Sequence, residues 1–353
     1  MIKLLTYPDI DPQQWQALIN RSPYATWFQT KEAYEFYAAL SSELIPFAFG
    51  IEECRGDEAM RQLGDKDGSR LVGVIVGYIT RERNAIKQFF TRRAIIIGGP
   101  LLAEDISNEA LSMLLTSLKN LPSLQGGAGV GLPIYIETRN FHDYSKWKSV
   151  FGTNGFAYQP HYDIHVHCNA QHQMSEQRIR QVKKAVKNGA EIVEASSAQE
   201  IRDWYRILSQ LYRTKVRTPL FSEEFFLRFY RNGVGKYLLV KYQGKIIGGM
   251  MCPILKGKAV YEWYVCGLNE EYREQYPSVM ATYAAIEYAK TNALPLFDFM
   301  GAGKPDIPYG VRDFKMEFGG ELLEHGRFLC VRKPLLYWIG KMGVRLLKRR
   351  NIK

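Results

Sequence analysis

The sequence has few cysteines and no long apolar run, and each absence excludes a class of protein. Five cysteines are spread over 353 residues with no C-x-x-C pair, so we expect reduced thiols in the cytosol rather than a disulfide framework. No apolar stretch approaches the roughly 20 residues that cross a bilayer, and the first residues lack the apolar core of a signal peptide. We expect a cytoplasmic protein, either free or peripheral to the inner face of the membrane.

Metal ligands are scarce as well. The nearest candidate set is His161, His165 and His167, followed by Cys168. It lacks carboxylate or further thiolate partners at ligand spacing. We interpret these alternating histidines as the polar face of a strand, and we expect no metal and no permanently bound cofactor.

Acidic residues are missing from the C-terminal segment. Eight of the 47 basic residues lie from Arg332 onward with no acidic residue among them, so most of the net charge of +11 belongs there. The rest of the chain is nearly balanced, which excludes a broad nucleic-acid-binding surface. We predict a basic amphipathic helix in residues 334–353, with one apolar face formed by Leu335, Trp338, Ile339, Met342, Leu346 and Leu347. It either lies on an anionic membrane surface or packs that face on the neighbouring domain.

Two sets of strand and helix patterns follow one another in the same order, and the length favours two domains. The segments are strands at 71–79, 94–102, 132–137, 245–252, 259–266 and 294–299, and helices at 108–119 and 278–291. We interpret the order as an internal duplication. The prediction is an α/β (α+β) fold of two domains with mixed, mostly antiparallel sheets flanked by helices. The domains would span residues 1–170 and 171–333, with the tail at 334–353.

A basic helix is predicted between the two halves, at 175–188, and Gly189 would end it. Its Arg178, Lys183 and Lys184 have two interpretations. They contact phosphates of a donor substrate, or they belong to a solvated linker helix.

A glycine-rich loop and a nearby lysine form the most informative pattern. Gly301 and Gly303 follow the apolar run 297–300, and Lys315 lies between Phe314 and Phe318. Glycines let a backbone approach a ligand closely, and a lysine in apolar surroundings presents a poorly screened charge. The pattern suits a site that stabilises a phosphate or an oxyanion. The alternative is a strand, a turn and a lysine that extends to water.

Other charged residues near these segments are also candidates. Asp298 and Glu262 lie in apolar strands, which is unusual for carboxylates, and either could accept a proton from an attacking ammonium. Asp298 also suits ordering the glycine loop, and Glu262 also suits facing water. Arg217 is a candidate anion binder or a surface ion pair. Lys304 and Tyr309 belong to the same loop region and are candidate substrate contacts.

Several short motifs, in this order along most of the chain, resemble the Fem-type aminoacyltransferases, which contain two GNAT acyltransferase modules. The motifs are Thr26–Thr30, Ile97–Leu101, Arg178–Gly189, Thr214–Arg217, Phe297–Gly301, Phe314–Lys315 and Phe318–Gly320. No sustained heptads occur, so the chain resembles members without a coiled-coil arm. The second-half motifs are shared with acyltransferase-like domains of exopolysaccharide and biotin-associated clusters.

The resemblance implies transfer of an aminoacyl group, from aminoacyl-tRNA, to an amine of a cell-envelope or peptidoglycan precursor. It implies that Lys315 stabilises the oxyanion or the departing hydroxyl, with Phe314 shaping the pocket. The acceptor would lie near Arg217, Gly301 and Gly303. Losing such a donor costs about a hundredfold in turnover or more, and we expect Lys315→Met to show this loss with folding intact.

Two departures from the family pattern keep other functions open. A lysine expected after the N-terminal motif has no counterpart past Lys31, which weakens the assignment of the acceptor. The stretch 273–278 lacks the glycines that bind CoA pyrophosphate in ordinary GNAT enzymes, and Pro277 removes an N–H donor. The alternatives are an acyl-CoA-dependent N-acyltransferase acting on a sugar or lipid amine, and a non-catalytic module that binds membrane or RNA.

Overall fold

The computed structural model describes residues 1–54, 69–81, 91–121, 132–169 and 171–350, with side chains as far as residue 342. The chain divides into two compact units. The first comprises Met1–Pro160 and His325–Lys353, and the second comprises His161–Glu324. The predicted two-unit α/β fold with mixed, mostly antiparallel sheets is confirmed.

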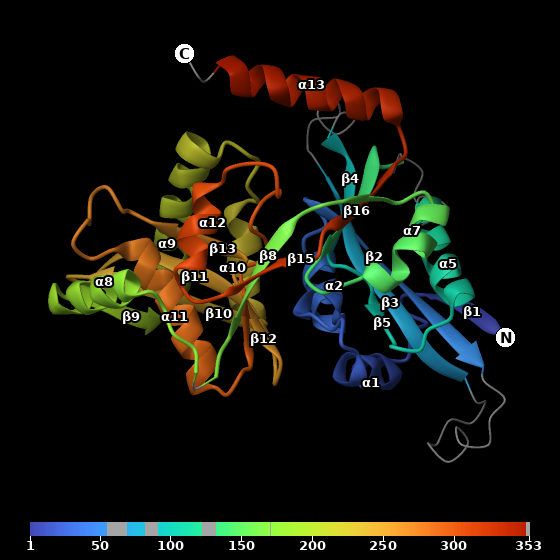
Figure 1. The fold of residues 1–353 in the computed structure, drawn as a ribbon, viewed down its shortest axis with the longest axis horizontal. Coiled ribbons are helices and arrows are strands. Elements are labelled where there is room, and N and C mark those ends of the chain that lie inside the picture. Colours follow the sequence, from blue (N-terminus) through green and yellow to red (C-terminus); the bar gives the residue numbers. More distant parts are fainter. Residues whose placement is uncertain (55–68, 82–90, 122–131, 170, 351–353) are drawn as a thin grey trace. The chain divides into compact units, whose positions relative to one another are not determined.

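The first unit is built on one sheet with the strand order β1-β2-β3-β4-β6-β16-β7, and β5 pairs with β3. Its strands are β1 (Ile2–Thr6), β2 (Leu44–Cys54), β3 (Ser69–Thr80), β4 (Arg93–Gly98), β5 (Leu101–Leu102), β6 (Tyr135–Asn140), β7 (Ala157–Gln159) and β16 (Arg327–Val331). Its helices are α1 (Pro12–Arg21), α2 (Lys31–Ala38), α5 (Asn108–Ser117), α7 (Lys148–Thr153) and α13 (Pro334–Arg350), with short 3₁₀ turns η1 (Trp27–Gln29), η2 (Leu118–Asn120) and η3 (Ser145–Trp147). Figure 1 shows α1, α2 and α5 beside β2 and β3.

The second unit has an equivalent sheet with the order β15-β8-β14-β12-β11-β10-β9, and β13 pairs with β11. Its strands are β8 (Tyr162–His167), β9 (Ala190–Glu194), β10 (Gly235–Tyr242), β11 (Lys245–Leu255), β12 (Ala259–Tyr261), β13 (Tyr264–Gly267), β14 (Leu296–Asp298) and β15 (Glu321–Glu324). Its helices are α8 (Glu176–Lys187), α9 (Ala198–Leu211), the π-helical turn η4 (Tyr212–Val216), α10 (Glu223–Asn232), α11 (Pro277–Thr291) and α12 (Gly310–Met316).

The same strand–helix–strand arrangement occurs in both units. In the first, β4 and β6 are parallel neighbours joined through α5; in the second, β12 and β14 are parallel neighbours joined through α11. Among the described strands, each of these pairs is the parallel step in an otherwise antiparallel sheet. The repeat supports the internal duplication read from the sequence.

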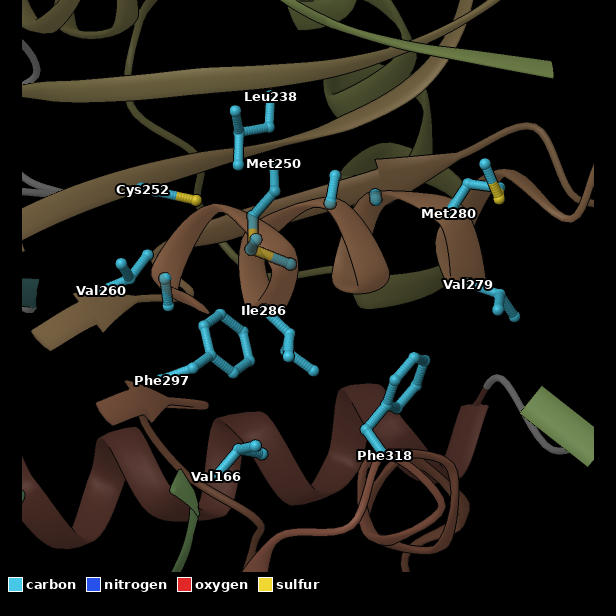
Figure 2. Packing of buried hydrophobic residues seen from close by; sticks show 14 of the residues in the cluster. Val166, Leu238, Met250, Cys252, Val260, Val279, Met280, Ile286, Phe297 and Phe318 are labelled. Atoms are coloured by element: carbon cyan, nitrogen blue, oxygen red, sulfur yellow. The ribbon is translucent and has the colours of Figure 1, made fainter. Parts of the chain in front are cut away.

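The core of the second unit lies between α11 and the sheet. Its side chains are fully or nearly fully buried, and they include Met250, Ile286, Phe297 and Phe318. In Figure 2, Ile286 of α11 points toward Phe297 of β14. Because β14 is held between α11 and its neighbours, the loop that follows it starts from a fixed position.

The unit boundaries differ from those expected at 170/171 and 333/334. β8 begins at Tyr162 and pairs with β14 and β15 of the second unit. β16 returns to the first unit, where it lies between β6 and β7. Long-range strand pairing therefore decides which segment belongs to which unit.

The C-terminal segment forms the predicted helix, α13. Tyr337 contacts Tyr135 of β6, with ring centroids 5.5 Å apart. Leu335, Trp338 and Ile339 are 71%, 60% and 42% exposed. These three residues of the apolar face thus do not pack on the domain. Across the described residues, no helix is long and apolar enough to cross a membrane.

Candidate active site

The glycine-rich loop, Phe299–Gly303, begins directly after β14 and turns back sharply. Met300 has a φ of 56°, and Gly301 and Gly303 have φ values of 134° and 82°. A Cβ at Gly303 would lie 2.9 Å from the ring of Tyr309. Glycine is therefore needed at 303 both for the backbone conformation and for space.

Lys315 of α12 is buried, and it points into this loop. Its Nζ donates hydrogen bonds to the carbonyl oxygens of Phe299 and Gly301, each at 2.9 Å. It also forms an ion pair with Glu262 Oε1 at 2.9 Å. An ammonium has three N–H donors, and three acceptors surround this one. In this conformation Lys315 orders the loop, and it can reach an incoming oxyanion only by releasing one of these partners.

Two buried carboxylates hold the same loop by its amides. Asp298 accepts from the N–H of Met300 at 2.6 Å, and Asp163 of β8 accepts from the N–H of Gly301 at 2.7 Å. The N–H of Gly301 is therefore taken by the protein itself. Asp298, which the sequence pattern linked to this loop, does contact its backbone.

His165 lies between these two carboxylates. Its Nε2 is 3.4 Å from Asp298 Oδ2 and 3.9 Å from Asp163 Oδ2, and all three side chains are buried. Burial lowers the pKa of His165, but the neighbouring Asp298 and Asp163 outweigh it and raise that pKa to about 9. Burial and the nearby Asp298 raise the pKa of Asp163 well above its usual range. His165 is therefore an imidazolium at neutral pH.

The interpretation of the histidines as a polar strand face was wrong for His165. The carboxylates that the pattern did not supply come from Asp163, two residues away, and from Asp298 on a different strand. Their ligand atoms and that of His165 lie within 4.8 Å of one another. Because two carboxylates face one imidazole, we interpret this group as an ion cluster.

Glu262 is buried rather than facing water, and it follows the end of β12. Burial raises its pKa, against the opposing effect of Lys315. Tyr212, from the π-helical turn η4, interacts electrostatically with Glu262 and Tyr309, and its pKa is raised to about 12, chiefly by burial. The sequence analysis missed Tyr212, although it lies two residues before the start of the motif at 214–217.

Arg312 is a second residue that the sequence analysis missed. Its guanidinium donates to the carbonyl oxygen of Ala302 at 2.8 Å and also to that of Lys304. It stacks 4.9 Å from the centre of the Tyr162 ring. Arg312 and Lys315 come from consecutive turns of α12 and together donate to five carbonyls of the loop region, those of Phe299, Gly301, Ala302, Lys304 and Ile307. The i, i+3 spacing of the two cations was the available signal.

The remaining loop candidates lie at the surface of the same region. Lys304 is exposed and Tyr309 is 42% exposed. Phe314 is half-buried, and its ring lies 5.3 Å from that of Phe318. Arg217 is exposed at the end of η4, with its Nε donating to the carbonyl of Thr214 at 3.1 Å. None of these roles has been tested by the geometry, and they stay predictions.

The three basic residues of α8 have different surroundings. Arg178 is buried, with its guanidinium 4.4 Å from the centre of the Phe314 ring and 3.3 Å from Glu317. Its contacts with Phe314 and Glu317 hold α8 against α12, and it does not face solvent. Lys184 pairs with Glu274 at 2.6 Å, while Lys183 is exposed. The geometry therefore leaves Lys183 as the α8 candidate best placed to meet a polyanion.

The N-terminus of α11 is occupied by groups of the chain itself. Pro277 has no N–H, and the N–H of Ser278 donates to Asn269 Oδ1 at 3.0 Å. The Asn269 amide donates in turn to Ser278 Oγ at 2.7 Å. A Cβ at Gly267 would lie 2.8 Å from the nitrogen of Ser278, so the strand and the helix end are in close contact.

A separate polar cavity of about 420 Å³ lies at the end of β8. Its lining residues are His167, Asn169, Gln171, His172, Gln173, Gly319, Gly320 and Glu321. His172 Nε2 lies 2.6 Å from the carbonyl oxygen of Phe318, and that contact links the cavity wall to the segment after α12. None of its lining residues belongs to the loop.

Two motifs of the first unit meet in space. The side-chain amide of Gln29 donates to the carbonyls of Gly98 and Gly99 at 3.3 and 2.8 Å, and its oxygen accepts from the N–H of Thr26 at 2.8 Å. Gly98 and Gly99 have positive φ values. Motifs that are 70 residues apart thus form one buried turn contact, and they stabilise the first unit.

The tandem architecture, with a strand–helix–strand repeat in each unit, is the fold of a pair of GNAT-type units. Residues 175–316 match the model of the acetyltransferase (GNAT) domain family. This segment runs from the cap of α8 to the end of α12, so it includes the loop and Lys315. No curated protein matches the chain in sequence.

Solved structures share the fold over nearly the whole chain. The crystal structure of FemX has a TM-score of 0.66 at 14% identity, covering 96% of this chain and 99% of that one. L-PGS from Bacillus licheniformis has a TM-score of 0.52 at 10% identity, covering 94% and 96%. A tandem GNAT protein from the clavulanic acid biosynthesis pathway has a TM-score of 0.52 at 10% identity, covering 93% and 98%. The chain therefore has a Fem-like tandem GNAT fold, and the matched domain identifies it as an acyltransferase.

Proposed function

We propose that the protein transfers an aminoacyl group from aminoacyl-tRNA to an amine of a cell-envelope precursor, such as a peptidoglycan precursor. Support comes from the Fem-like two-unit fold together with the ordered motifs that resemble Fem-type enzymes. A further similar structure is named a putative lysylphosphatidylglycerol synthetase, with a TM-score of 0.51.

The observation that carries the choice of donor is the occupied N-terminus of α11. Helix N-termini bind phosphates through free N–H groups, and GNAT enzymes that use acyl-CoA have a glycine loop at this point. Here Pro277 supplies no donor and Asn269 accepts from Ser278. The loop that precedes the helix is held by the ion pair of Lys184 with Glu274, which places a carboxylate nearby. These features disfavour a CoA pyrophosphate and favour another activated acyl donor.

The chemistry requires alignment and charge stabilisation more than thermodynamic drive. The acceptor amine attacks the ester carbonyl, a C–N bond forms, the ester C–O bond breaks, and the amine's proton ends on the departing ribose hydroxyl. Alignment of the two substrates contributes roughly 7–11 kcal/mol. In our proposal Glu262, whose pKa burial raises, accepts the proton from the amine. Protonated Glu262 holds Lys315 less strongly, so the ammonium can turn toward the oxyanion.

The proposed acceptor contacts are Arg217, Lys304 and Tyr309 at the surface of the loop region. Phe314 would shape the pocket, and the glycines at 301 and 303 would let the acceptor approach the loop backbone. Contacts to the donor's phosphates would come from Lys183 and the other exposed cations of α8. Arg178 would contribute by holding α8 on α12.

We further propose that α13 attaches the protein to the anionic inner face of the membrane. Leu335, Trp338 and Ile339 form an exposed apolar strip, and Lys341 beside it is exposed. The sequence of this segment from Arg332 onward is rich in basic residues and has no acidic one. An apolar strip with an interfacial tryptophan and flanking cations fits lipid headgroups. Attachment would keep the enzyme near a lipid-linked acceptor.

Transfer from an acyl-CoA to a sugar or lipid amine is the second candidate. The observation in its favour is the match of residues 175–316 to an acetyltransferase domain family. The third candidate is a non-catalytic module that binds membrane or RNA, and it would be supported if neither donor gave transfer.

The deciding experiment supplies the full chain with radiolabelled aminoacyl-tRNA or acyl-CoA and a mixture of amine-bearing envelope precursors. We expect label in the precursor from aminoacyl-tRNA, and its loss when RNase is added before the enzyme. RNase-resistant transfer from acyl-CoA would replace the first candidate by the second. No transfer from either donor, with vesicle binding retained, would leave the non-catalytic module.

A further inference from the structure

The ion cluster behind the loop has no part in the proposed chemistry, and of its three residues only Asp298 belongs to one of the motifs. Asp163, His165 and Asp298 are 2%, 6% and 0% exposed, so a substrate cannot contact them. Each carboxylate nevertheless uses one oxygen, Oδ1, to hold an amide of the loop, at Gly301 or Met300. Each directs its other oxygen, Oδ2, toward His165 Nε2.

Two buried carboxylates this close repel each other unless a cation lies between them. A carboxylate that takes a proton or rotates away would no longer hold its loop amide in the same position. Lys315 is bonded to two carbonyls of the same loop. Any shift of Phe299 or Gly301 therefore moves the lysine as well.

We propose that His165 is a positioning residue of the transferase site. Its imidazolium holds Asp163 and Asp298 in the orientation in which they fix the loop amides, and through the loop it fixes Lys315. That this is a transferase site rests on the proposed function, whereas the role of His165 in ordering the loop does not.

The groups around His165 come from several elements. Asp163 lies on its own strand, and Asp298 lies at the end of β14. Glu321 of β15 is its backbone partner and also raises the pKa of His165. Glu262 is close enough to Asp298 for that carboxylate to raise the pKa of Glu262. Lys315 is close enough to Asp163 to lower the pKa of Asp163. Acidic groups outnumber the cations, which fits a histidine that keeps its proton.

The sign of the pH dependence follows from the pKa. The pKa of His165 is about 9 in the folded chain and about 6.5 in an unfolded one. The stabilisation from the imidazolium is therefore complete below about pH 6.5 and is lost as the pH rises through about 9.

The test uses the full chain with His165→Gln, His167→Gln and the double variant His165→Gln/Asp298→Asn. His167 is the matched control, since it lies two residues along the same strand with its side chain 62% exposed. Asn at 298 keeps an acceptor for the Met300 amide and removes one of the two facing carboxylates. Thermal unfolding between pH 6 and 9.5 and hydrogen–deuterium exchange of residues 299–303, corrected for intrinsic rates, are measured for each.

We expect His165→Gln to lower the Tm by at least about 5 °C at pH 6.5, to speed exchange of residues 299–303 at least tenfold, and to flatten the loss of Tm toward pH 9.5. The double variant should recover at least half of both losses. If His165→Gln matches His167→Gln, or if its effects are equal at all pH values and Asp298→Asn does not relieve them, the proposal is overturned.

Where transfer is measurable, the kcat of His165→Gln should fall at least tenfold, with KM within twofold of the wild-type value. An unchanged kcat beside a disordered loop would overturn the positioning role, while absence of transfer in the wild type would count against the proposed function alone.

Discussion

At the scale of single residues, the site is a set of buried charges arranged around one loop. Lys315 and Arg312 hold its carbonyls, while Asp163 and Asp298 hold its amides. Buried charges are costly unless they are paired and hydrogen-bonded. Their presence here indicates that the loop has to keep one conformation, and its backbone has few free groups left with which to bind a ligand.

The expectation that Lys315→Met leaves folding intact does not agree with these contacts. The change leaves Glu262 and two carbonyls without their buried partner, which costs about 3 kcal/mol or more. We expect a clearly lower denaturation midpoint and at least a hundredfold loss of turnover. Urea unfolding and a transfer assay measure the two effects.

Adding Glu262→Gln to Lys315→Met separates the two effects. The double variant has no unpaired buried carboxylate, so it should recover stability while turnover stays low. Because Glu262 is the proposed proton acceptor, recovery of turnover together with stability would show that neither Glu262 nor Lys315 takes part in transfer directly.

The sequence indicated part of this site. The glycines were singled out as a loop pattern, and Lys315, Asp298 and Glu262 as charges within apolar runs; the structure places these residues around one loop. Asp163 and His165 were not assigned to this site, because their partners come from a strand over 130 residues away. Only the pairing of β8 with β14, Asp298 opposite His165, brings them together.

At the scale of elements, two strands that the sequence predicted as continuous are each divided into two in the structure. The run 94–102 becomes β4 and β5, because Gly98 and Gly99 adopt positive φ between them. The run 259–266 becomes β12 and β13, which pair with different parts of β11. Periodicity locates an apolar segment, but the partner that ends its pairing lies elsewhere in the sequence. Helices α8 and α11 matched their predicted ranges closely, since their signals are local.

The segment after α12 offers a test at this scale. Gly319 has a φ of 78°, and a Cβ there would lie 2.0 Å from the carbonyl oxygen of Gln173. We expect Gly319→Ala to lower the Tm by at least about 5 °C, because both the backbone and its neighbour must shift. Calorimetry against Gly257→Ala provides the comparison: Gly257 has a φ of 70° with open space around it. Equal effects of the two changes would mean that the close contact at Gly319 is unimportant.

At the scale of the whole molecule, the duplication and the fold class followed from the order of elements, and the boundaries did not. The contribution of β16 to the first sheet depends on pairing with β6, almost 200 residues away. No local composition shift marks it. The amphipathic character of α13 was readable, yet its exposed strip is known only from the three-dimensional arrangement.

Trp338 provides a spectroscopic test of membrane attachment. The other five tryptophans are buried or half-buried, so quenching by brominated lipids reports on this one. We expect quenching with vesicles that contain phosphatidylglycerol and little with phosphatidylcholine alone, because the flanking cations favour anionic lipid. Trp338→Glu should weaken sedimentation with vesicles at least about tenfold.

Met113→Glu is the matched control for this test, since Met113 is a 40% exposed apolar residue on α5 of the same unit. It should bind vesicles as the wild type does. Equal loss in both variants, or binding that ignores lipid charge, would contradict attachment through α13.

The interrupted course of the first unit has a consequence for synthesis. β16, which separates β6 from β7 in that sheet, begins at Arg327, after every strand of the second unit. On the ribosome, the opening 160 residues must wait, with a gap beside β6, until the intervening module has been translated and has emerged. The nascent chain therefore completes its inner module first and closes its outer one last.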